Sequence, residues 1–476
     1  MAALRRIAVL GSGIGAWAAS AYLARLLKRL GTEIIQIPAG VDTPPPPVLP
    51  ALPSLESLHL ALGFDPGDLI RATGASFRLG TRLAATRGVM AYGDTGAAFG
   101  TVPFHLAWRA HAEDLSPAAY AHHCLAALAA QTGRFAPPLD DGPPGSSYSP
   151  GLHMDGAAYL SFLQRAGLHY GVIPGAPLAS GGSQLKAGQL RLADGTALTA
   201  DLVIDTAGLG PAPETDSFPA LPGQIRLRYG RKAEASALGM ATLQASAGSL
   251  ALDIPLSAEI IRVFIAPSES AAHRASSLLR RDGFEPLREG GSSFAPMRVR
   301  QPWQGRLIRI GEAACRLPPV EAVDLRILQA GLETLAQTLP GGHPDMPERG
   351  EYNRLMGDTF EALADYVAMA FLTPSEMPDT LPPSLRLRLE NFTSRGRVLL
   401  TDGESFTRES WASAYVAFGW TMRRADAHAA ALPAERVRAS LAGMRGALTA
   451  TSETLPDQRT YLRHAGLVAP SRAGAR

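Results

Sequence analysis

The sequence predicts an α/β protein with a Rossmann-like, doubly wound, mostly parallel sheet, and three observations lead to this fold class. A short apolar strand at 7–10 runs into a glycine-rich turn and then into a helix over 17–30, the order found at dinucleotide-binding turns. Apolar strands at 202–205 and 307–310 also end in small residues. Beyond residue 346 the pattern is mainly helical.

Length and composition limit the class of protein further. The chain has 476 residues, and we expect a nucleotide-binding module with an interleaved, substrate-side β-sheet over 1–345 and a mainly helical region over 346–476. Hydrophobic residues make up 46% and charged residues 18%, which is typical of a globular protein. The net charge of +2 gives no support for nucleic-acid binding.

Apolar runs, cysteines and histidines bear on location and metal content. No apolar run reaches the roughly 18 residues of a membrane span, so no membrane partner is expected. Cys124 and Cys315 are too few for a disulfide framework, and a cytoplasmic protein is predicted. His122 and His123 are adjacent on an expected helix and so point in different directions; we interpret them as surface residues and expect no metal site.

The remaining elements follow in order. A second strand is expected at 33–37, followed by a proline-rich loop at 43–50 that cannot be a helix or a central strand. Period-two strands are expected at 225–229 and 260–265, and a hairpin over 185–202 should turn at Asp194-Gly195. Helices are predicted at 55–62, 117–131, 153–168 and 351–371, a loop at 137–150, and a frayed tail at 469–476.

Two turns are candidates for holding a nucleotide. Gly11-x-Gly13-x-x-Ala16 joins a strand to a helix whose first N–H groups can bind a phosphate. The strand ending at Asp205 continues into a small-residue turn at Gly208, a second place where a dinucleotide could lie. The second strand, however, carries Gln36 and lacks the expected terminal acid, so we expect weaker contact with the ribose.

Motifs along nearly the whole chain resemble the flavin-dependent tryptophan halogenase family. They comprise the opening loop 11–17, the segments 102–108, 153–155 and 200–208, the stretch from Pro302-Trp303 to Glu321, and the segments 351–354 and 405–411. The resemblance implies an FAD-dependent oxidoreductase, a monooxygenase-like flavoprotein that uses oxygen and reduced FAD from a separate flavin reductase. The substrate would be a small aromatic molecule, an indole for example, or a peptide.

The resemblance also assigns roles to residues of this chain. Gly311, Glu312 and Ala314 form the turn after the flavin strand, and a helix begins near Val323. Glu321 falls on the glutamate that faces the substrate, and Arg78 on the lysine between flavin and substrate. These two residues are the candidate catalytic residues, and Gly11, Gly13, Ala16, Asp205, Gly208, Gly311, Glu312 and Ala314 are the candidate cofactor-binding residues.

Several departures from the family pattern weaken the case for halogenation. Arg78 carries a permanently charged, fork-shaped guanidinium group, which cannot form a haloamine as a lysine amine can. The three lysines of the chain, Lys28, Lys186 and Lys232, lie in other segments. Prolines over 46–51 replace glycines of the flavin-side loop, so FAD is expected to bind weakly. Two family tryptophans are replaced by Leu250 and Leu252, and one histidine by Leu106.

The role of Glu321 and the function of the chain therefore stay open. Glu321 could be a general base or orienting group, a helix-start carboxylate, or the partner of Arg78 in an ion pair that fills the former tunnel. The chain could be a divergent halogenase or a hydroxylating flavin monooxygenase. It could also be a non-catalytic pseudoenzyme that pairs with an intact paralogue, as a heterodimer, or with itself.

Overall fold

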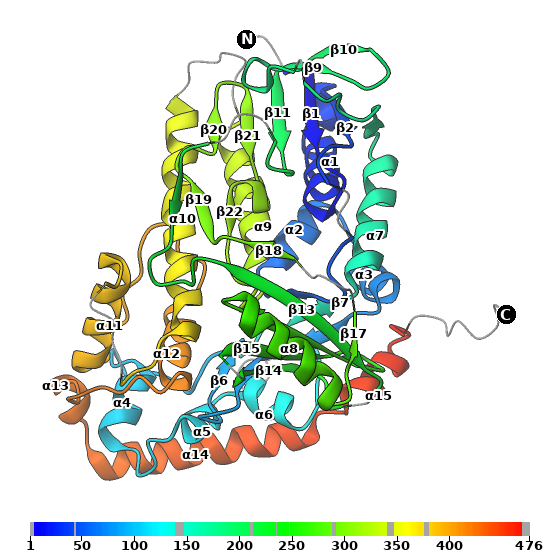
Figure 1. Ribbon diagram of the computed structural model, residues 1–476. Coiled ribbons are helices and arrows are strands. Elements are labelled where there is room, and N and C mark those ends of the chain that lie inside the picture. Colours follow the sequence, from blue (N-terminus) through cyan, green and yellow to red (C-terminus); the bar gives the residue numbers. More distant parts are fainter. Residues whose placement is uncertain are drawn as a thin grey trace.

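The computed structural model describes residues 4–41, 44–138, 147–181, 183–209, 213–234, 236–246, 248–287, 292–339, 347–375 and 380–468. It confirms the predicted α/β class, with a parallel sheet at one end and a second, mixed sheet beside it (Figure 1). The expected tail at 469–476 and part of the expected loop at 137–150 lie outside the described residues.

The nucleotide-binding half is built on a sheet of six described strands, in the order β20-β21-β11-β1-β2-β8. All are parallel except β20, which is antiparallel to β21. Residues 7–10 of β1 are fully buried, as expected for an apolar run at the centre of a parallel sheet. The strands are β1 (Arg6–Leu10), β2 (Glu33–Ile37), β8 (Ile173–Pro174), β11 (Leu202–Asp205), β20 (Trp303–Gln304) and β21 (Leu307–Arg309).

The interleaved sheet runs β17-β13-β16-β15-β14-β5-β6, with β18 also on β13. It is mixed because β14 pairs with β5 in parallel, while its other pairs are antiparallel. Helix α8 (Glu269–Arg281) packs on it. The strands are β5 (Gly80–Leu83), β6 (Val89–Ala91), β13 (Ile225–Lys232), β14 (Met240–Ser246), β15 (Ser249–Pro255), β16 (Ile260–Ala266), β17 (Glu285–Pro286) and β18 (Ser293–Phe294).

Three small sheets accompany these two, and one of them carries Arg78. In it β7 (Gly151–Met154) lies between β3 (Leu49–Ala51) and β4 (Ser76–Arg78). The predicted hairpin is present as β9 (Gln189–Arg191) and β10 (Ala197–Thr199). The third sheet contains β12 (Thr215–Ser217), β19 (Met297–Val299) and β22 (Cys315–Arg316).

The predicted C-terminal helical region is confirmed, and α10 runs beside α9 while α14 lies along α4 and α6 (Figure 1). Whether it is a separate domain stays a prediction. No helix of the described residues is long and apolar enough to cross a membrane. The helices are α1 (Ile14–Leu26), α2 (Leu55–Ala61), α3 (Pro66–Thr73), α4 (Phe104–His111), α5 (Pro117–Ala121), α6 (Leu125–Gln131), α7 (Gly156–His169), α9 (Val323–Gln337), α10 (Pro347–Ala368), α11 (Pro383–Arg395), α12 (Arg408–Ala417), α13 (Ala427–Ala430), α14 (Ala434–Thr454) and α15 (Gln458–His464), with 3-10 turns η1 (Lys28–Leu30), η2 (Leu185–Ala187), η3 (Gly311–Ala313) and η4 (Met369–Phe371).

Several expected boundaries differ from the structure. The helix expected at 153–168 begins only at Gly156, because Asp155 caps it by accepting a hydrogen bond of 2.7 Å from the Ala158 N–H. His153 therefore lies in a strand. The helix expected at 117–131 is interrupted, since Cys124 has an extended backbone and is the N-cap residue that precedes α6. The first helix starts three residues earlier than expected, directly after Gly13.

Candidate functional site

The three turns that carry the candidate cofactor-binding residues meet at one edge of the parallel sheet. Strands β1, β11 and β21 are neighbours, so the turns that follow them emerge side by side. The Thr206 N–H donates to the Leu10 carbonyl at 3.1 Å, and the Ile310 N–H donates to the Asp205 carbonyl at 3.0 Å. Parallel α/β sheets bind ligands at this edge, outside the carboxyl ends of their strands.

The Gly11–Ala16 turn has the shape that a phosphate needs. Gly11 has a φ of +135°, and a Cβ atom there would lie 2.4 Å from Thr206 Oγ1, so only glycine fits. A Cβ at Gly13 would meet no atom within 4 Å, so the space beside this residue is open. Helix α1 begins here with no side-chain cap and no acid in its first turn, which leaves its first N–H groups for an anion. Ala16 is fully buried and supports the turn by packing.

Gln36 is turned inward and bonds to the glycine turn. It is buried, and its side-chain N–H donates a 2.5 Å hydrogen bond to the Gly11 carbonyl. The neutral contact that the sequence suggested for a ribose is therefore used within the protein.

The other candidate cofactor residues have different environments. Asp205 is fully buried, accepts hydrogen bonds from the N–H groups of Ala207 (2.9 Å) and Leu209 (2.8 Å), and faces Arg309. Burial raises its pKa to about 6, although these partners oppose the shift. A Cβ at Gly208, where φ is +72°, would meet nothing within 4 Å. Asp205 thus shapes a turn whose open side is at Gly208.

The turn after β21 is the 3-10 turn η3. Gly311 begins it with a φ of +66°, and Ala314, which ends it, is buried. Glu312 is exposed and pairs with Arg316 at 3.1 Å. Helix α9 follows, beginning at Val323 as the sequence predicts.

The proline-rich segment is fixed beside the start of α7. A Cβ at Gly156 would lie 2.2 Å from the Pro46 carbonyl oxygen, so the two backbones are in close contact. Pro50 lies in β3, an edge strand of its sheet, where a missing N–H is tolerated. Prolines over 44–47 can offer no N–H group to a flavin.

Arg78 and Glu321 form a buried ion pair. The Arg78 Nη2 atom lies 3.2 Å from Glu321 Oε2, and each side chain is only 1% exposed. The same Nη2 atom donates to Thr81 Oγ1 at 2.8 Å. Arg78 is also a cause of the strongly lowered pKa of His153, although burial contributes more. His153 is therefore neutral, and Arg78 is the cation of this cluster.

The backbone that presents Glu321 is unusual. Glu321 and Ala322 have φ values of +56° and +58°, the left-handed region that residues with a Cβ rarely adopt. Such conformations cost about 1–3 kcal/mol each and concentrate at functional sites. This left-handed backbone directs the Glu321 side chain toward Arg78 at the end of β4, immediately before α9 begins.

A cavity of about 420 Å³ lies beside this pair. Its volume is in the range of small-molecule sites, about 300–1,000 Å³. Its aromatic wall consists of Tyr92, Tyr148, Tyr366 and Phe406, and the polar lining residues include Ser54, Asp94, Ser405 and Glu409. Neither Arg78 nor Glu321 is among the lining residues. The ion pair is thus closed off, but an aromatic cavity remains open next to it.

Tyr92 joins the cavity to the pair, and it was not among the residues predicted from the sequence. Its hydroxyl donates to Glu321 Oε2 at 2.7 Å, and its ring lies 5.0 Å from the Arg78 guanidinium. Tyr366 was also missed; its ring stacks on Phe406 with centroids 3.7 Å apart. From the sequence pattern alone, an aromatic residue in or after a strand cannot be told apart from an aromatic residue of the hydrophobic core. The glycine that follows Tyr92, Gly93, was the one local signal that could have drawn attention to it.

The three lysines lie away from this cavity. Lys28 is in η1, Lys186 is in η2, and Lys232 ends β13, where it pairs with Glu234 at 2.6 Å. None of them lines the cavity in the described part of the chain. The described lysines therefore offer no amine to this cavity, and the assignment of Arg78 to the family's lysine position stays a prediction.

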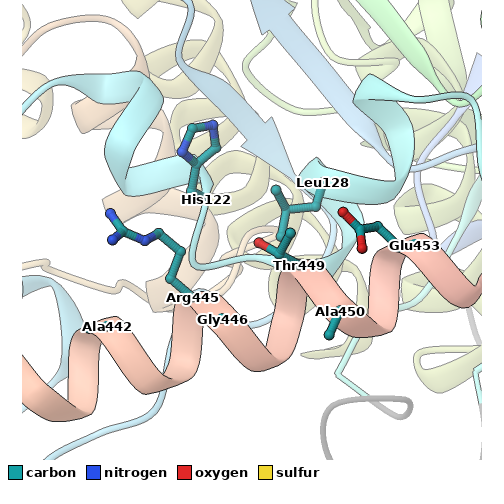
Figure 2. Close-up of a pocket in the computed structure, with 8 residues that line it drawn as sticks. All are labelled: His122, Leu128, Ala442, Arg445, Gly446, Thr449, Ala450 and Glu453. Atoms are coloured by element: carbon teal, nitrogen blue, oxygen red, sulfur yellow. The ribbon is translucent and has the colours of Figure 1, made fainter.

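A separate hollow of about 570 Å³ lies between α14 and the segment from His122 to Leu128. Figure 2 shows Arg445 and Glu453 projecting from α14 toward that segment. His122 lines it, whereas His123 is buried and lies 3.0 Å from the Ala119 carbonyl. The interpretation of both histidines as surface residues was therefore wrong for His123, because the break before α6 turns it into the core.

Together these features define a dinucleotide-binding α/β protein with an aromatic cavity beside a buried ion pair. The sequence pattern of the tryptophan halogenase family matches residues 6–211 and 245–434, and the chain belongs to this family. Membership implies FAD as the cofactor, and the open phosphate turn at Gly13 fits the phosphates of such a group.

Solved structures show the same fold. Xcc4156, a flavin-dependent halogenase from Xanthomonas campestris, has a TM-score of 0.88 at 24% identity, with 100% of each chain covered. BrvH, a flavin-dependent halogenase from Brevundimonas sp. BAL3, has a TM-score of 0.87 at 22% identity, covering 98% of this chain and 99% of its own. SttH, a tryptophan 6-halogenase from Streptomyces toxytricini, has a TM-score of 0.83 at 15% identity, covering 96% and 99%. No curated protein matches the sequence.

Proposed function

We propose that this chain is an FAD-dependent oxidoreductase that oxidises a small aromatic substrate. We further propose that it hydroxylates this substrate and does not halogenate it, because Arg78 cannot carry a halogen as a lysine amine can. The observation that supports this proposal most directly is the aromatic cavity beside Arg78 and Glu321. A residue at the lysine position that is locked in a buried ion pair cannot present a compact ammonium group to a substrate.

The residues proposed to hold FAD are those of the three adjoining turns. Gly11, Gly13 and the first N–H groups of α1 would receive the phosphates, with Ala16 packing beneath them. Gly208, Gly311, Glu312 and Ala314 would border the rest of the cofactor, and Asp205 would hold its turn in shape. When bound and reduced by a separate reductase, FAD would supply the activation of oxygen.

On the substrate side, the cavity would bind the ring and exclude water. Four aromatic side chains offer faces and edges to a flat ring, and such contacts contribute about 0.5–1.5 kcal/mol each beyond the burial of area. Glu321 would act from behind Tyr92 as a proton acceptor, and Arg78 would hold this carboxylate in position.

Equilibrium binding of aromatic probes tests the proposal. Indole and phenol should bind to the purified chain with dissociation constants that rise when Phe406→Ala removes the ring that stacks on Tyr366. Leu400→Ala, at an exposed position, is the control. Wild-type protein that binds neither probe would remove the basis of the proposal.

A second candidate is a non-catalytic subunit that pairs with an intact paralogue or with itself. The proline-rich segment, which has no N–H group to offer over 44–47 and is pressed against Gly156, favours it. Purified protein that stays colourless and takes up no FAD in a titration would support this second candidate over the enzyme.

A further inference from the structure

Tyr92 occupies the boundary between the aromatic cavity and the buried ion pair. It follows β6 and lines the cavity, while its hydroxyl donates to Glu321 Oε2 at 2.7 Å. Its ring lies over the Arg78 guanidinium at 5.0 Å, within the range of a cation–π contact. One residue therefore touches the cavity, the carboxylate and the cation at once.

Glu321 cannot be reached from the cavity without Tyr92. The Glu321 side chain is 1% exposed and does not line the cavity, so a molecule bound there cannot contact the carboxylate. A phenol has one O–H donor and two acceptor lone pairs. Because Tyr92 already donates to Glu321, its oxygen can accept a hydrogen bond from a donor group in the cavity.

We propose that Tyr92 relays a proton from the O–H or ring N–H of an aromatic substrate to Glu321. The substrate O–H or N–H bond breaks, and its proton bonds to the Tyr92 oxygen. The Tyr92 O–H bond breaks at the same time, and that proton bonds to Glu321 Oε2. The electron pair stays on the substrate, which becomes an electron-rich phenolate or azolate, and nothing is oxidised or reduced in this step.

The charges around Tyr92 are consistent with such a relay. Before the transfer Arg78 faces the Glu321 carboxylate, and afterwards it faces a substrate anion through the Tyr92 ring, so the net charge of the site does not change. Burial, with Glu321 nearby, holds the pKa of Tyr92 well above its usual value. Tyr92 thus passes a proton on and does not itself remain ionised.

Tyr366 shows why the relay is specific to Tyr92. It lines the same cavity, but its hydroxyl is directed to the Met90 sulfur at 3.8 Å, and its ring packs on Phe406 and Trp411. Tyr366→Phe therefore keeps the ring and removes a hydroxyl from the cavity wall without removing a hydrogen bond to Glu321. It is the matched control for Tyr92→Phe, which keeps the ring over Arg78.

The test uses the full chain without flavin and two probes, 4-nitrophenol and its methyl ether, 4-nitroanisole. Only the phenol can donate a proton, and its anion is distinguished by its visible absorption. We expect wild-type protein to bind 4-nitrophenol about tenfold more tightly than 4-nitroanisole. The reason is that only the phenol can donate a hydrogen bond to the Tyr92 oxygen, whose own hydroxyl is bonded to the Glu321 carboxylate. The apparent pKa of the bound phenol should lie below that of the free phenol. Tyr92→Phe should lose both effects, and Tyr366→Phe should keep them.

The relay rests on the proposed aromatic site, and the outcomes separate the two. Equal binding of both probes by wild-type protein, or equal losses in the two variants, overturns the relay and leaves the aromatic cavity standing. Binding of neither probe overturns both. If Tyr92→Phe does not fold, as judged by circular dichroism, the pKa of 4-nitrophenol bound to wild-type protein decides: an unshifted value overturns the relay.

Discussion

Arg78 Nη2 lies 3.2 Å from Glu321 Oε2, with both side chains almost completely withdrawn from solvent. Removing one partner of a buried pair typically costs about 3–5 kcal/mol, because the other charge is left uncompensated. Glu321→Ala should therefore lower the melting temperature clearly, while Arg78→Met with Glu321→Leu should be tolerated much better. Glu33→Ala, which breaks the exposed pair with Arg6, is the control and should change stability by no more than about 1 kcal/mol. A double variant as unstable as Glu321→Ala would contradict this account.

Free tryptophan should not be halogenated by this chain. With a flavin reductase, oxygen and chloride or bromide, product analysis by mass spectrometry should show little or no halotryptophan, because Arg78 cannot carry a halogen as an amine does. Arg78→Lys alone should not restore the reaction, since the proline segment over 46–51 is unchanged. Robust product from wild-type protein would show that the lysine is dispensable here.

FAD should bind weakly, with a dissociation constant in the micromolar range or above, a free energy of roughly −8 kcal/mol or weaker. The reasons are the absent N–H groups of the proline segment and the inward orientation of Gln36. Isothermal titration measures this directly, and Gly13→Val, which fills the open phosphate turn, should weaken binding further. Nanomolar affinity would favour a fully functional flavoenzyme.

The stability contribution of Asp205 should depend on pH in a defined direction. Burial raises its pKa from 3.8 to about 6 in the folded state, so the folded chain binds more protons than the unfolded chain between these values. Stability relative to Asp205→Asn should therefore fall as the pH rises from 4 to 7, by at most roughly 3 kcal/mol at about 1.4 kcal/mol per unit. Urea unfolding across this range measures the difference.

Asp194 provides a control of opposite sign for that experiment. It lies on the exposed hairpin turn, and hydrogen bonds from Thr196 lower its pKa. Its stabilising contribution should be present at neutral pH and lost as the pH falls through its lowered pKa. A parallel trend in Asp205→Asn and Asp194→Asn would point to a global effect of pH and not to Asp205.

Much of the nucleotide half could be predicted because glycine spacing and apolar runs are local signals. Gly11 and Gly13 lie where the sequence places them, and the strand ending at Asp205 lies next to β1 as a parallel sheet requires. The boundary at 153–168 was wrong because a cap at Asp155 outweighed the helical pattern before it.

The cavity could not be predicted in the same way, because its walls come from segments far apart in the sequence. Tyr92 follows β6, whereas Tyr366 belongs to α10. Each reads as an ordinary core aromatic until tertiary packing brings them together. The meeting of Arg78 and Glu321 was anticipated only through the resemblance, since no local pattern links positions so far apart.

The hydrogen bond from Gln36 to the Gly11 carbonyl also bears on how fast a cofactor would come and go. It connects the end of β2 to the glycine turn and holds that turn in its open shape within the protein itself. The loop has little conformational freedom left to lose on binding, so the turn is preorganised for a phosphate. The association rate constant of FAD should then be nearly as high as in a relative that binds FAD tightly. If the affinity for FAD is low, the cause should be a high dissociation rate constant. Such a chain would exchange its cofactor readily with the surrounding solution.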